Sequence, residues 1–144
     1  MSNAIVLSQN GQWTWMHGSQ LNDQGPVYGT KGLANTSNTP CVTYEAAEWT
    51  DTSGNLWLYG GAGSDAIGTW GYLSDLWKYN IESNEWTWVK GDTAKNKSAS
   101  YGIQGFATAT NSPGNRADAV SWVDASGNLW LFGGKRLPGG EKLN

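Results

Sequence analysis

The chain has little of what most metal-binding and nucleophilic chemistry uses, with one cysteine and one histidine among 144 residues. Cys41 by itself cannot form an intrachain disulfide. A single histidine, His17, excludes most His/Cys metal sites and any Ser-His-Asp triad that does not include it. The sequence therefore predicts neither a metal centre nor a cofactor.

Charge is scarce as well, at 15% charged residues with a formal net charge of -3 and no basic stretch. Such a chain is a poor partner for nucleic acids and for anionic membranes. No apolar run approaches the ~20 residues that a membrane-spanning helix needs. The apolar run at 4–7 is too short for the core of a signal peptide. The cellular location stays open between an intracellular protein and one whose leader has been removed.

Glycine and tryptophan are abundant, with 20 and 10 residues respectively. Helix-forming runs are sparse, glycine interrupts every segment, and aromatic residues alternate with polar ones. Alternation with a period of two, bounded by turn residues, is typical of half-buried strands. The composition and pattern therefore predict an all-β protein.

One stretch of nine residues occurs almost unchanged in two places: SGNLWLYGG at 53–61 returns as SGNLWLFGG at 126–134. The triplet Trp-Thr-Trp occurs at 13–15 and at 86–88, with the same separation of 73 positions. Self-similarity at a fixed separation is the signature of repeat architectures. The chain is thus predicted to hold about two copies of one unit.

Each copy divides into short strands separated by turn signals such as Ser-Gly-Asn, which suits a tight hairpin. Four antiparallel strands, with Gly-Gly and Trp at fixed places, are the make-up of a propeller blade. The predicted strands are Tyr44–Asp51, Leu56–Tyr59, Leu76–Tyr79 and Glu85–Val89 in one unit, and Ala117–Asp124 and Leu129–Phe132 in the next.

The stretches NLWLFGG, DLWKYN and NEWTWVKG together resemble a kelch repeat. That family has a hydrophobic strand ending in Gly-Gly, then an aromatic strand, then an outer strand bearing Trp. The resemblance covers nearly the whole chain, includes Pro113-x-x-Arg116, and extends to bacterial kelch-like proteins and to the kelch-type blades of galactose oxidase. It implies a kelch-type β-propeller with two four-stranded blades' worth per chain. Kelch units usually span ~50 residues, and the extra length here falls in the connections 18–40 and 92–113.

Residues shared by the two copies are expected to be structural, because equivalent positions make equivalent packing contacts. One copy departs from the kelch pattern where Cys41-Val42-Thr43 replaces Gly114-Asn115-Arg116, so its loop is expected to pack differently. The structural set comprises Trp13, Trp15, Trp49, Trp57, Gly60, Gly61, Trp77, Trp86, Trp88, Trp122, Trp130, Gly133 and Gly134.

The alignment places a complete blade at 41–91 and incomplete ones on either side of it. A lone blade covers neither of its faces, and open strand edges are sticky. The halves are therefore expected to meet across a subunit boundary in a head-to-tail ring. A six-bladed homotrimer is the first expectation and a tetramer the second, with an open filament or a fragment completed by another chain as alternatives. The remaining segments are a half blade at 1–17 (strands three and four), a half blade at 114–134 (strands one and two) and a tail at 135–144.

Residues that do not repeat are the better candidates for a ligand site. The glycine-rich segment Ala62–Ser74, expected to be a loop, carries Trp70 and Tyr72. Exposed aromatic rings suit contact with a sugar or peptide, because a flat ring offers a large area at little entropic cost. The alternative is that Trp70 packs over a neighbouring blade.

Three charged residues complete the candidate ligand set. Glu45 aligns with Asp118 on the innermost strand, so a ring of blades would place carboxylates around one axis. Such carboxylates either hold a cation through their oxygens or are simply solvated. Arg116, from the kelch-like Pro-x-x-Arg stretch, is the third candidate.

Enzymatic constellations are not predicted. Glu45 and Glu48 are three apart on one strand and so point to opposite faces, which separates a possible acid–base pair. One histidine and one cysteine do not meet the copper requirement of galactose oxidase. The stretch 51–57 resembles the Asp box of sialidases but has one residue too many between Asp and Gly, as does 124–130.

The sequence thus favours a non-catalytic module that acts as a protein-interaction or carbohydrate-binding scaffold and assembles with copies of itself. One alternative is a purely structural or engineered propeller fragment without a ligand. A further alternative is a carbohydrate-active enzyme domain.

Overall fold

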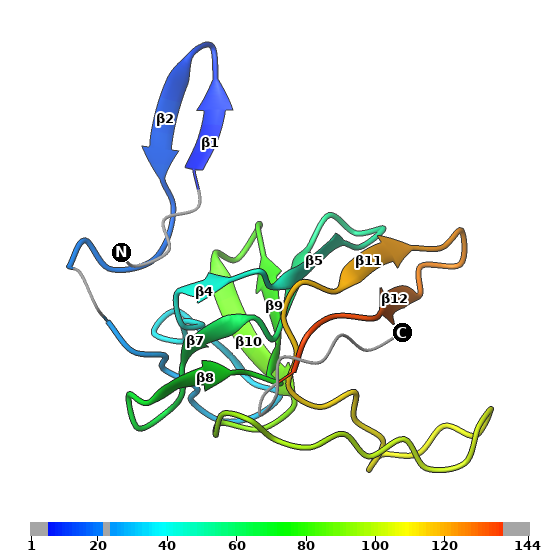
Figure 1. Cartoon of the computed structure of the whole chain (residues 1–144). Helices are drawn as coiled ribbons and strands as arrows, with labels where there is room; N and C mark the ends of the chain where they lie inside the picture. The colour runs from blue at the N-terminus through cyan, green and yellow to red at the C-terminus, as the bar shows by residue number, and fades with distance from the viewer. Residues whose placement is uncertain (1–5, 22–23, 137–144) are drawn as a thin grey trace.

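The computed structural model describes residues 6–21 and 24–136, and within them every regular element is a strand (Figure 1). The strands are arranged in four antiparallel sheets, none of which closes on itself. No helix in these residues is long and apolar enough to cross a membrane. The strands are β1 (Val6–Gln9), β2 (Gln12–Trp15), β3 (Ala34–Asn35), β4 (Thr43–Tyr44), β5 (Ala47–Thr50), β6 (Leu56–Tyr59), β7 (Ala62–Ser64), β8 (Trp70–Tyr72), β9 (Leu76–Asn80), β10 (Glu85–Lys90), β11 (Val120–Val123) and β12 (Leu129–Phe132).

The largest sheet, called the central sheet below, has the strand order β3-β10-β9-β6-β5. Four of its strands lie where the sequence predicts strands. These four are β5, β6, β9 and β10, and they lie side by side in the order in which they occur along the chain. Strand β5 begins at Ala47 rather than at the predicted Tyr44, because Glu45 has a left-handed backbone with φ of 57°. The fifth strand, β3, was not predicted: its residues Ala34 and Asn35 pair with Thr87 and Trp86 at the outer edge.

Aromatic side chains form the core on one face of the central sheet. Trp77, Tyr79 and Trp86 are buried together with Tyr28, and Leu56, Leu58 and Trp88 pack against them. Rings of this size bury 150–250 Å² each, so they supply most of the apolar surface removed from water here. The alternating pattern of β9 and β10 therefore has a structural role, as the sequence predicts.

The pair β11–β12, called the C-terminal hairpin below, covers the opposite face of the central sheet. Trp49 lies at this contact, and its indole Nε1 donates to the carbonyl of Trp130 at 2.9 Å. Ser121 Oγ donates to the carbonyl of Glu48, also at 2.9 Å. The shared cluster consists of Ala47, Trp49, Trp57, Tyr59 and Leu76 from the central sheet with Ala119, Val123, Leu129 and Leu131 from the hairpin and the chain leading to it.

A third sheet, called the small sheet below, has the order β4-β7-β8 and lies where a loop was expected at 62–74. That expectation is wrong for residues 62–64 and 70–72, which form a hairpin. Glycine pairs with glycine at its centre, Gly63 opposite Gly71, so no side-chain pattern marks these strands. Asp65 closes the turn by accepting hydrogen bonds from the backbone N–H of Ile67 and Thr69.

The pair β1–β2, called the N-terminal hairpin below, projects away from the other sheets (Figure 1). Asn10 and Gly11 both have positive φ, as a two-residue type I′ turn requires. The strand predicted at 4–7 is found at 6–9, with residues 4 and 5 outside the described ranges. The tight turn explains the shift, since the corresponding turn between β9 and β10 contains four residues.

Candidate functional site

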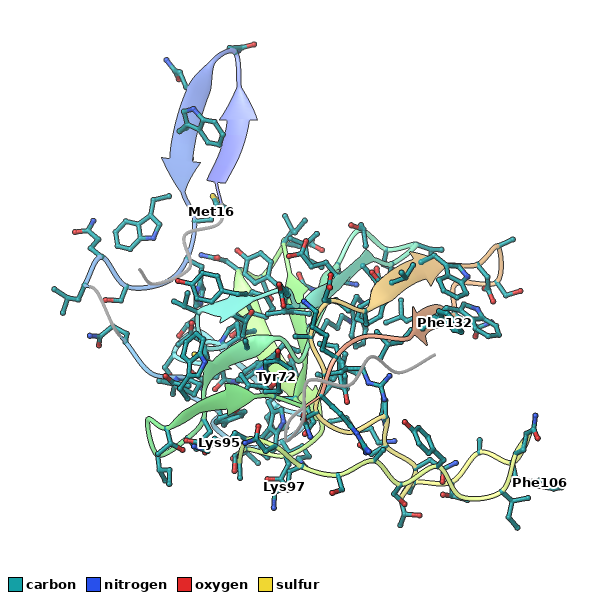
Figure 2. All side chains as sticks on the ribbon, viewed as in Figure 1. Met16, Tyr72, Lys95, Lys97, Phe106 and Phe132 are labelled. Carbon is teal, nitrogen blue, oxygen red and sulfur yellow. The ribbon has the colours of Figure 1, made fainter. Side chains whose placement is uncertain are left out.

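Three aromatic residues share one face of the small sheet and are called the aromatic face below. Tyr44 and Tyr72 both lie opposite Ala62, and Trp70 lies two residues from Tyr72 on β8. Directly opposed residues, and residues two apart on a strand, point to the same side. Figure 2 shows Tyr72 on this sheet.

Two of these rings are open to solvent and contact each other. Tyr44 and Trp70 are 63% and 55% exposed, and their centroids lie 5.8 Å apart in a tilted arrangement. Within the single chain, Trp70 is therefore available for contact with a ligand or with a neighbouring blade, the alternative given above. Tyr44 is not predictable from the sequence, because the pairing of β4 with β7 leaves no local pattern.

A cluster of three charged residues adjoins the aromatic face, because Glu45 directly follows Tyr44. Lys135 Nζ lies 3.1 Å from Asp118 Oδ2 and 3.6 Å from Glu45 Oε1. The hydrogen bond to Asp118 and the charges of both carboxylates raise the pKa of Lys135. The two acids, which occupy equivalent positions in the repeat, meet at this lysine, and neither lies within a strand, in contrast to the predicted innermost strand. The repeat gave no sign of the lysine, because the aligned residue in the first copy is Ala62.

Arg116, the third charged candidate, is buried, and its guanidinium donates mainly to backbone carbonyl groups. Its guanidinium donates to the carbonyl of Gly133 at 2.8 Å, to the hydroxyl of Tyr101 at 3.1 Å, and to the carbonyl of Pro113. Its own carbonyl accepts from the N–H of Gly61 at 2.9 Å. This position, inside the contact between successive repeats, gives Arg116 a structural part in holding the charged cluster in place.

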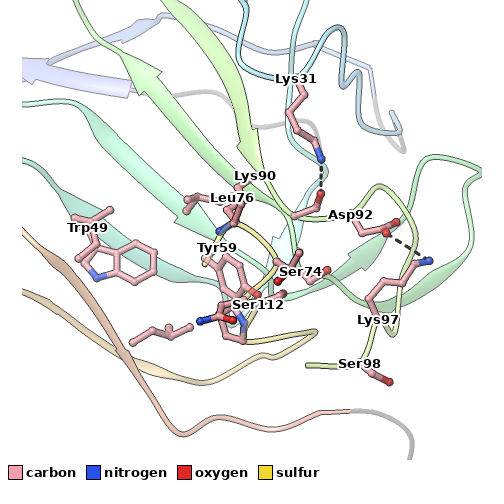
Figure 3. Close-up of a pocket in the computed structure, with 17 residues that line it drawn as sticks. Lys31, Trp49, Tyr59, Ser74, Leu76, Lys90, Asp92, Lys97, Ser98 and Ser112 are labelled. Atoms are coloured by element: carbon pink, nitrogen blue, oxygen red, sulfur yellow. Dashed lines mark hydrogen bonds and ion pairs between the residues drawn. The ribbon is translucent and has the colours of Figure 1, made fainter. Parts of the chain in front are cut away.

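A cavity of about 450 Å³ lies between the central sheet and the C-terminal hairpin (Figure 3). Its apolar wall includes Trp49, Tyr59 and Leu131, and its polar side includes Asp92 and Lys97, which lie 3.4 Å apart as an ion pair. The residues proposed from sequence as ligand contacts are absent from this lining. In residues 6–21 and 24–136, no three His, Cys, Asp or Glu side chains converge as a metal site would need.

The Asp-box-like stretches of both copies form the same hydrogen-bonded turn. Asp51 accepts from the N–H of Ser53 and Asn55 at 2.9 Å and from Trp57 Nε1 at 2.8 Å. Burial acts to raise the pKa of Asp51, but the hydrogen bonds from Trp57 and Asn55 outweigh it and hold that pKa at about 2. The corresponding bond from Trp130 holds the pKa of Asp124 at about 2. Each aspartate therefore joins the backbone of its hairpin turn to the indole of the tryptophan that follows.

Asp51→Asn is expected to lower the free energy of unfolding at pH 7 by about 1 kcal/mol, because one charge-assisted acceptor is lost. The pKa of Asp51 is lower in the folded state than in the unfolded state. Its contribution is therefore complete above about pH 4 and is lost as the pH falls toward 2. Denaturant titrations at both pH values should show the gap between wild type and variant closing in acid.

Glu82→Gln, at an exposed position in the turn between β9 and β10, is the control for the loss of a carboxylate. It should leave the free energy of unfolding unchanged at both pH values. A gap between Asp51→Asn and wild type that stays constant from pH 7 to pH 2 would contradict the role given to Asp51.

Comparison with known proteins adds no relative to this description. The chain matches no family model, no curated protein and no solved structure.

Proposed function

We propose that this protein is a kelch-type propeller unit that acts as a non-catalytic carbohydrate-binding scaffold, with the ligand on the aromatic face. The observation that carries the proposal is the exposed pair of Tyr44 and Trp70, side by side on one sheet. Planar rings of this kind stack on the apolar faces of sugars at little entropic cost. The carboxylates of Glu45 and Asp118 supply nearby hydrogen-bond acceptors for hydroxyl groups.

Two features of the fold support the propeller part of the proposal. The strands β5, β6, β9 and β10 follow one another in space in the order of a four-stranded blade. The C-terminal hairpin, which repeats the sequence of β5–β6, packs face to face on that sheet as the next blade in a ring does.

The absence of catalysis rests on the arrangement of the acidic groups. A glycosidase needs two carboxyl groups facing each other across the bond to be cleaved, one of them protonated. Here Glu45 and Asp118 instead share the ammonium group of Lys135. This pairing favours a binding surface over an acid–base pair.

Trp70→Ala is expected to weaken binding of the best oligosaccharide found on a glycan array by roughly 10-fold, since one stacked ring contributes about 1–1.5 kcal/mol. Isothermal titration calorimetry with that oligosaccharide is the measurement. The matched control is Ile67→Ala, which removes an 82% exposed apolar side chain from the same hairpin but lies in its turn.

Equal affinities for Trp70→Ala and Ile67→Ala would contradict the site. A glycan array without any bound sugar would contradict the ligand class, and a peptide library would then test the protein-interaction reading. A protein that binds neither class, yet assembles, is the purely structural propeller unit.

A further inference from the structure

Within the part of one chain that the structure describes, the faces of successive repeats meet in one hydrophobic cluster. It joins the face of the central sheet that carries Ala47, Trp49 and Tyr59 to Leu129 and Leu131 of the C-terminal hairpin. The first set is called the receiving face below and the second the covering face. Because the two partners are repeats of each other, each also has a copy of the opposite face.

The hairpin's own copy of the receiving face is open. Val120, Trp122 and Phe132 stand 73 positions after Ala47, Trp49 and Tyr59. They are 62%, 42% and 58% exposed, whereas their equivalents in the central sheet are 4%, 7% and 6% exposed. Figure 2 shows Phe132 on this hairpin, at the border of the molecule.

The central sheet's own copy of the covering face is half-buried. Leu56 and Leu58, which align with Leu129 and Leu131, pack against the aromatic core and line a second hollow of about 500 Å³. The molecule therefore presents both halves of a contact that it makes internally, at opposite ends and out of reach of each other.

Two chain segments between the repeats have the same internal structure. Residues 25–40 hold the bridge Val27–Thr39, and residues 98–113, called the second connection below, hold the bridge Ser100–Ser112. In each, an asparagine Nδ2 donates to a carbonyl five residues earlier at 3.0 Å: Asn38 to Leu33, and Asn111 to Phe106. The two segments therefore have the same local conformation, and we expect them to make the same kind of contact with a strand.

The first of these segments clamps strand β10, whereas among the described residues no strand carbonyl accepts from Asn111 Nδ2 or from the N–H of Gly105 in the second. Asn38 Nδ2 donates to the carbonyl of Trp86 at 3.0 Å, and the N–H of Gly32 donates to the carbonyl of Trp88 at 2.8 Å. Tyr28 is 8% exposed in the first clamp, whereas its equivalent Tyr101 is 63% exposed. Figure 1 shows the second connection reaching away from the sheets.

The N-terminal hairpin supplies a strand of the required kind. Trp13 and Trp15 of β2 align with Trp86 and Trp88 of β10, and they are 74% and 49% exposed. Trp15 Nε1 donates to the carbonyl of His17 at 2.9 Å, just as Trp88 Nε1 donates to that of Lys90. The hairpin thus already has the local structure of the clamped strand.

The place for such a strand pair is the 450 Å³ cavity. It is bounded by β12, by the receiving face of the central sheet, and by residues 109–113 of the second connection. Strand β12 pairs only with β11 in the described structure, whereas its equivalent β6 lies between β5 and β9. One edge of β12 therefore has free backbone groups beside the cavity.

We propose that β1–β2 of a second copy of this chain docks at this cavity, adds to the free edge of β12 and is clamped by the second connection. The proposal rests on the propeller reading given above and specifies its contacts. Asn111 Nδ2 donates to the carbonyl of the partner's Trp13, and the N–H of Gly105 donates to that of the partner's Trp15. The open receiving face, with Trp122 and Phe132, packs on Leu56 and Leu58 of the partner subunit.

These aromatic rings account for part of the surface that a stable complex needs. In one contact, Trp13 and Trp15 come from the inserting copy and Trp122 and Phe132 from the accepting copy, and together they offer at most roughly 600–1,000 Å² of the ~1,600 Å² that a standard interface buries in total. The strand backbones and the leucines Leu56 and Leu58 supply further area. The contact is head-to-tail, so that each copy has one inserting end and one accepting end, and repeated copies close into a ring if the rotation allows.

Light scattering coupled to gel filtration tests the assembly. Wild type is expected at three or four times the chain mass of 15.5 kDa. Trp13→Glu, which spoils the inserting end, and Phe132→Glu, which spoils the accepting end, should each run at 15.5 kDa. Ile67→Glu is the matched control at an equally exposed apolar position outside the contact, and it should keep the wild-type mass.

Mixing the two defective variants is the decisive arm. Trp13→Glu retains an intact accepting end and Phe132→Glu an intact inserting end, so an equimolar mixture should form a heterodimer of twice the chain mass. A mixture that stays at 15.5 kDa, a wild type that is monomeric at tens of micromolar, or variants that keep the wild-type mass each overturn the proposal.

The sugar-binding and assembly arms can fail separately. Trp70→Ala should lose oligosaccharide affinity and keep the wild-type mass, because the aromatic face lies outside the proposed contact. A monomeric wild type that still binds sugar overturns the assembly alone, and an assembled protein without a sugar ligand overturns the proposed ligand alone.

Discussion

Asp75→Ala is expected to lower the free energy of unfolding by about 3–5 kcal/mol, because it leaves two buried donors without an acceptor. Asp75 Oδ2 accepts from the hydroxyl of Tyr28 and from Trp77 Nε1, both at 2.8 Å. The carboxyl is 2% exposed and lies beside the aromatic core of the central sheet. Denaturant unfolding followed by tryptophan fluorescence measures the loss, with all variants at one protein concentration because association alters apparent stability.

Burial raises the pKa of Asp75, whereas hydrogen bonds outweigh burial at Asp51 and lower its pKa. A raised folded-state pKa means that its titration favours folding below the unfolded pKa and that this contribution is lost as the pH rises through the folded value. Asp75→Asn keeps an acceptor oxygen and removes the titration, so it should cost less than alanine and flatten this part of the pH dependence. Asp92→Ala, at the surface, is the control, and an equal cost for the two alanine variants would refute the buried network.

Gly60→Ala is expected to cost about 3–4 kcal/mol, the sum of a left-handed backbone penalty and a steric clash. Gly60 has φ of 63°, and a Cβ there would lie 2.6 Å from the carbonyl oxygen of Arg116 and 2.9 Å from that of Leu73. These backbone atoms belong to the hydrogen bonds that join successive repeats, so they have little room to move. The midpoint of denaturant unfolding is the measurement.

Gly68→Ala separates the two causes. Gly68 has φ of 77°, but nothing lies within 4 Å of a Cβ placed on it. It should therefore show the backbone penalty of about 1–2 kcal/mol without the clash. Similar losses for both variants would show that close approach at the Gly-Gly pair has no energetic role.

Much of the central sheet could be predicted because the same turn and strand sequences occur in both copies of the repeat. Trp57 and Trp130 follow the same Asp-capped turn, and the Gly-Gly pairs end the same strand in both copies. Local rules suffice for such elements, since a tight turn and a period-two pattern determine a hairpin without reference to distant residues. The kelch resemblance and the ring stay predictions, because they concern how blades close around an axis.

The candidate site was only partly predictable, for reasons that differ from residue to residue. Trp70 was found because an aromatic ring in a glycine-rich segment is unusual. Tyr44 was not found, since the pairing of β4 with β7 leaves no local pattern. Lys135 was not found either, because the ion pairs that it makes join three segments far apart in the chain.

The sequence by itself determined the all-β character, the 73-residue duplication and the four-strand order of the central sheet, because turn residues and alternation act over a few neighbouring positions. Only the tertiary structure decided that glycine strands form the small sheet, that Lys135 joins Glu45 to Asp118, and that Trp13 stays open while its repeat Trp86 is buried. Burial depends on which surfaces meet in space, and two copies with the same local sequence have different neighbours.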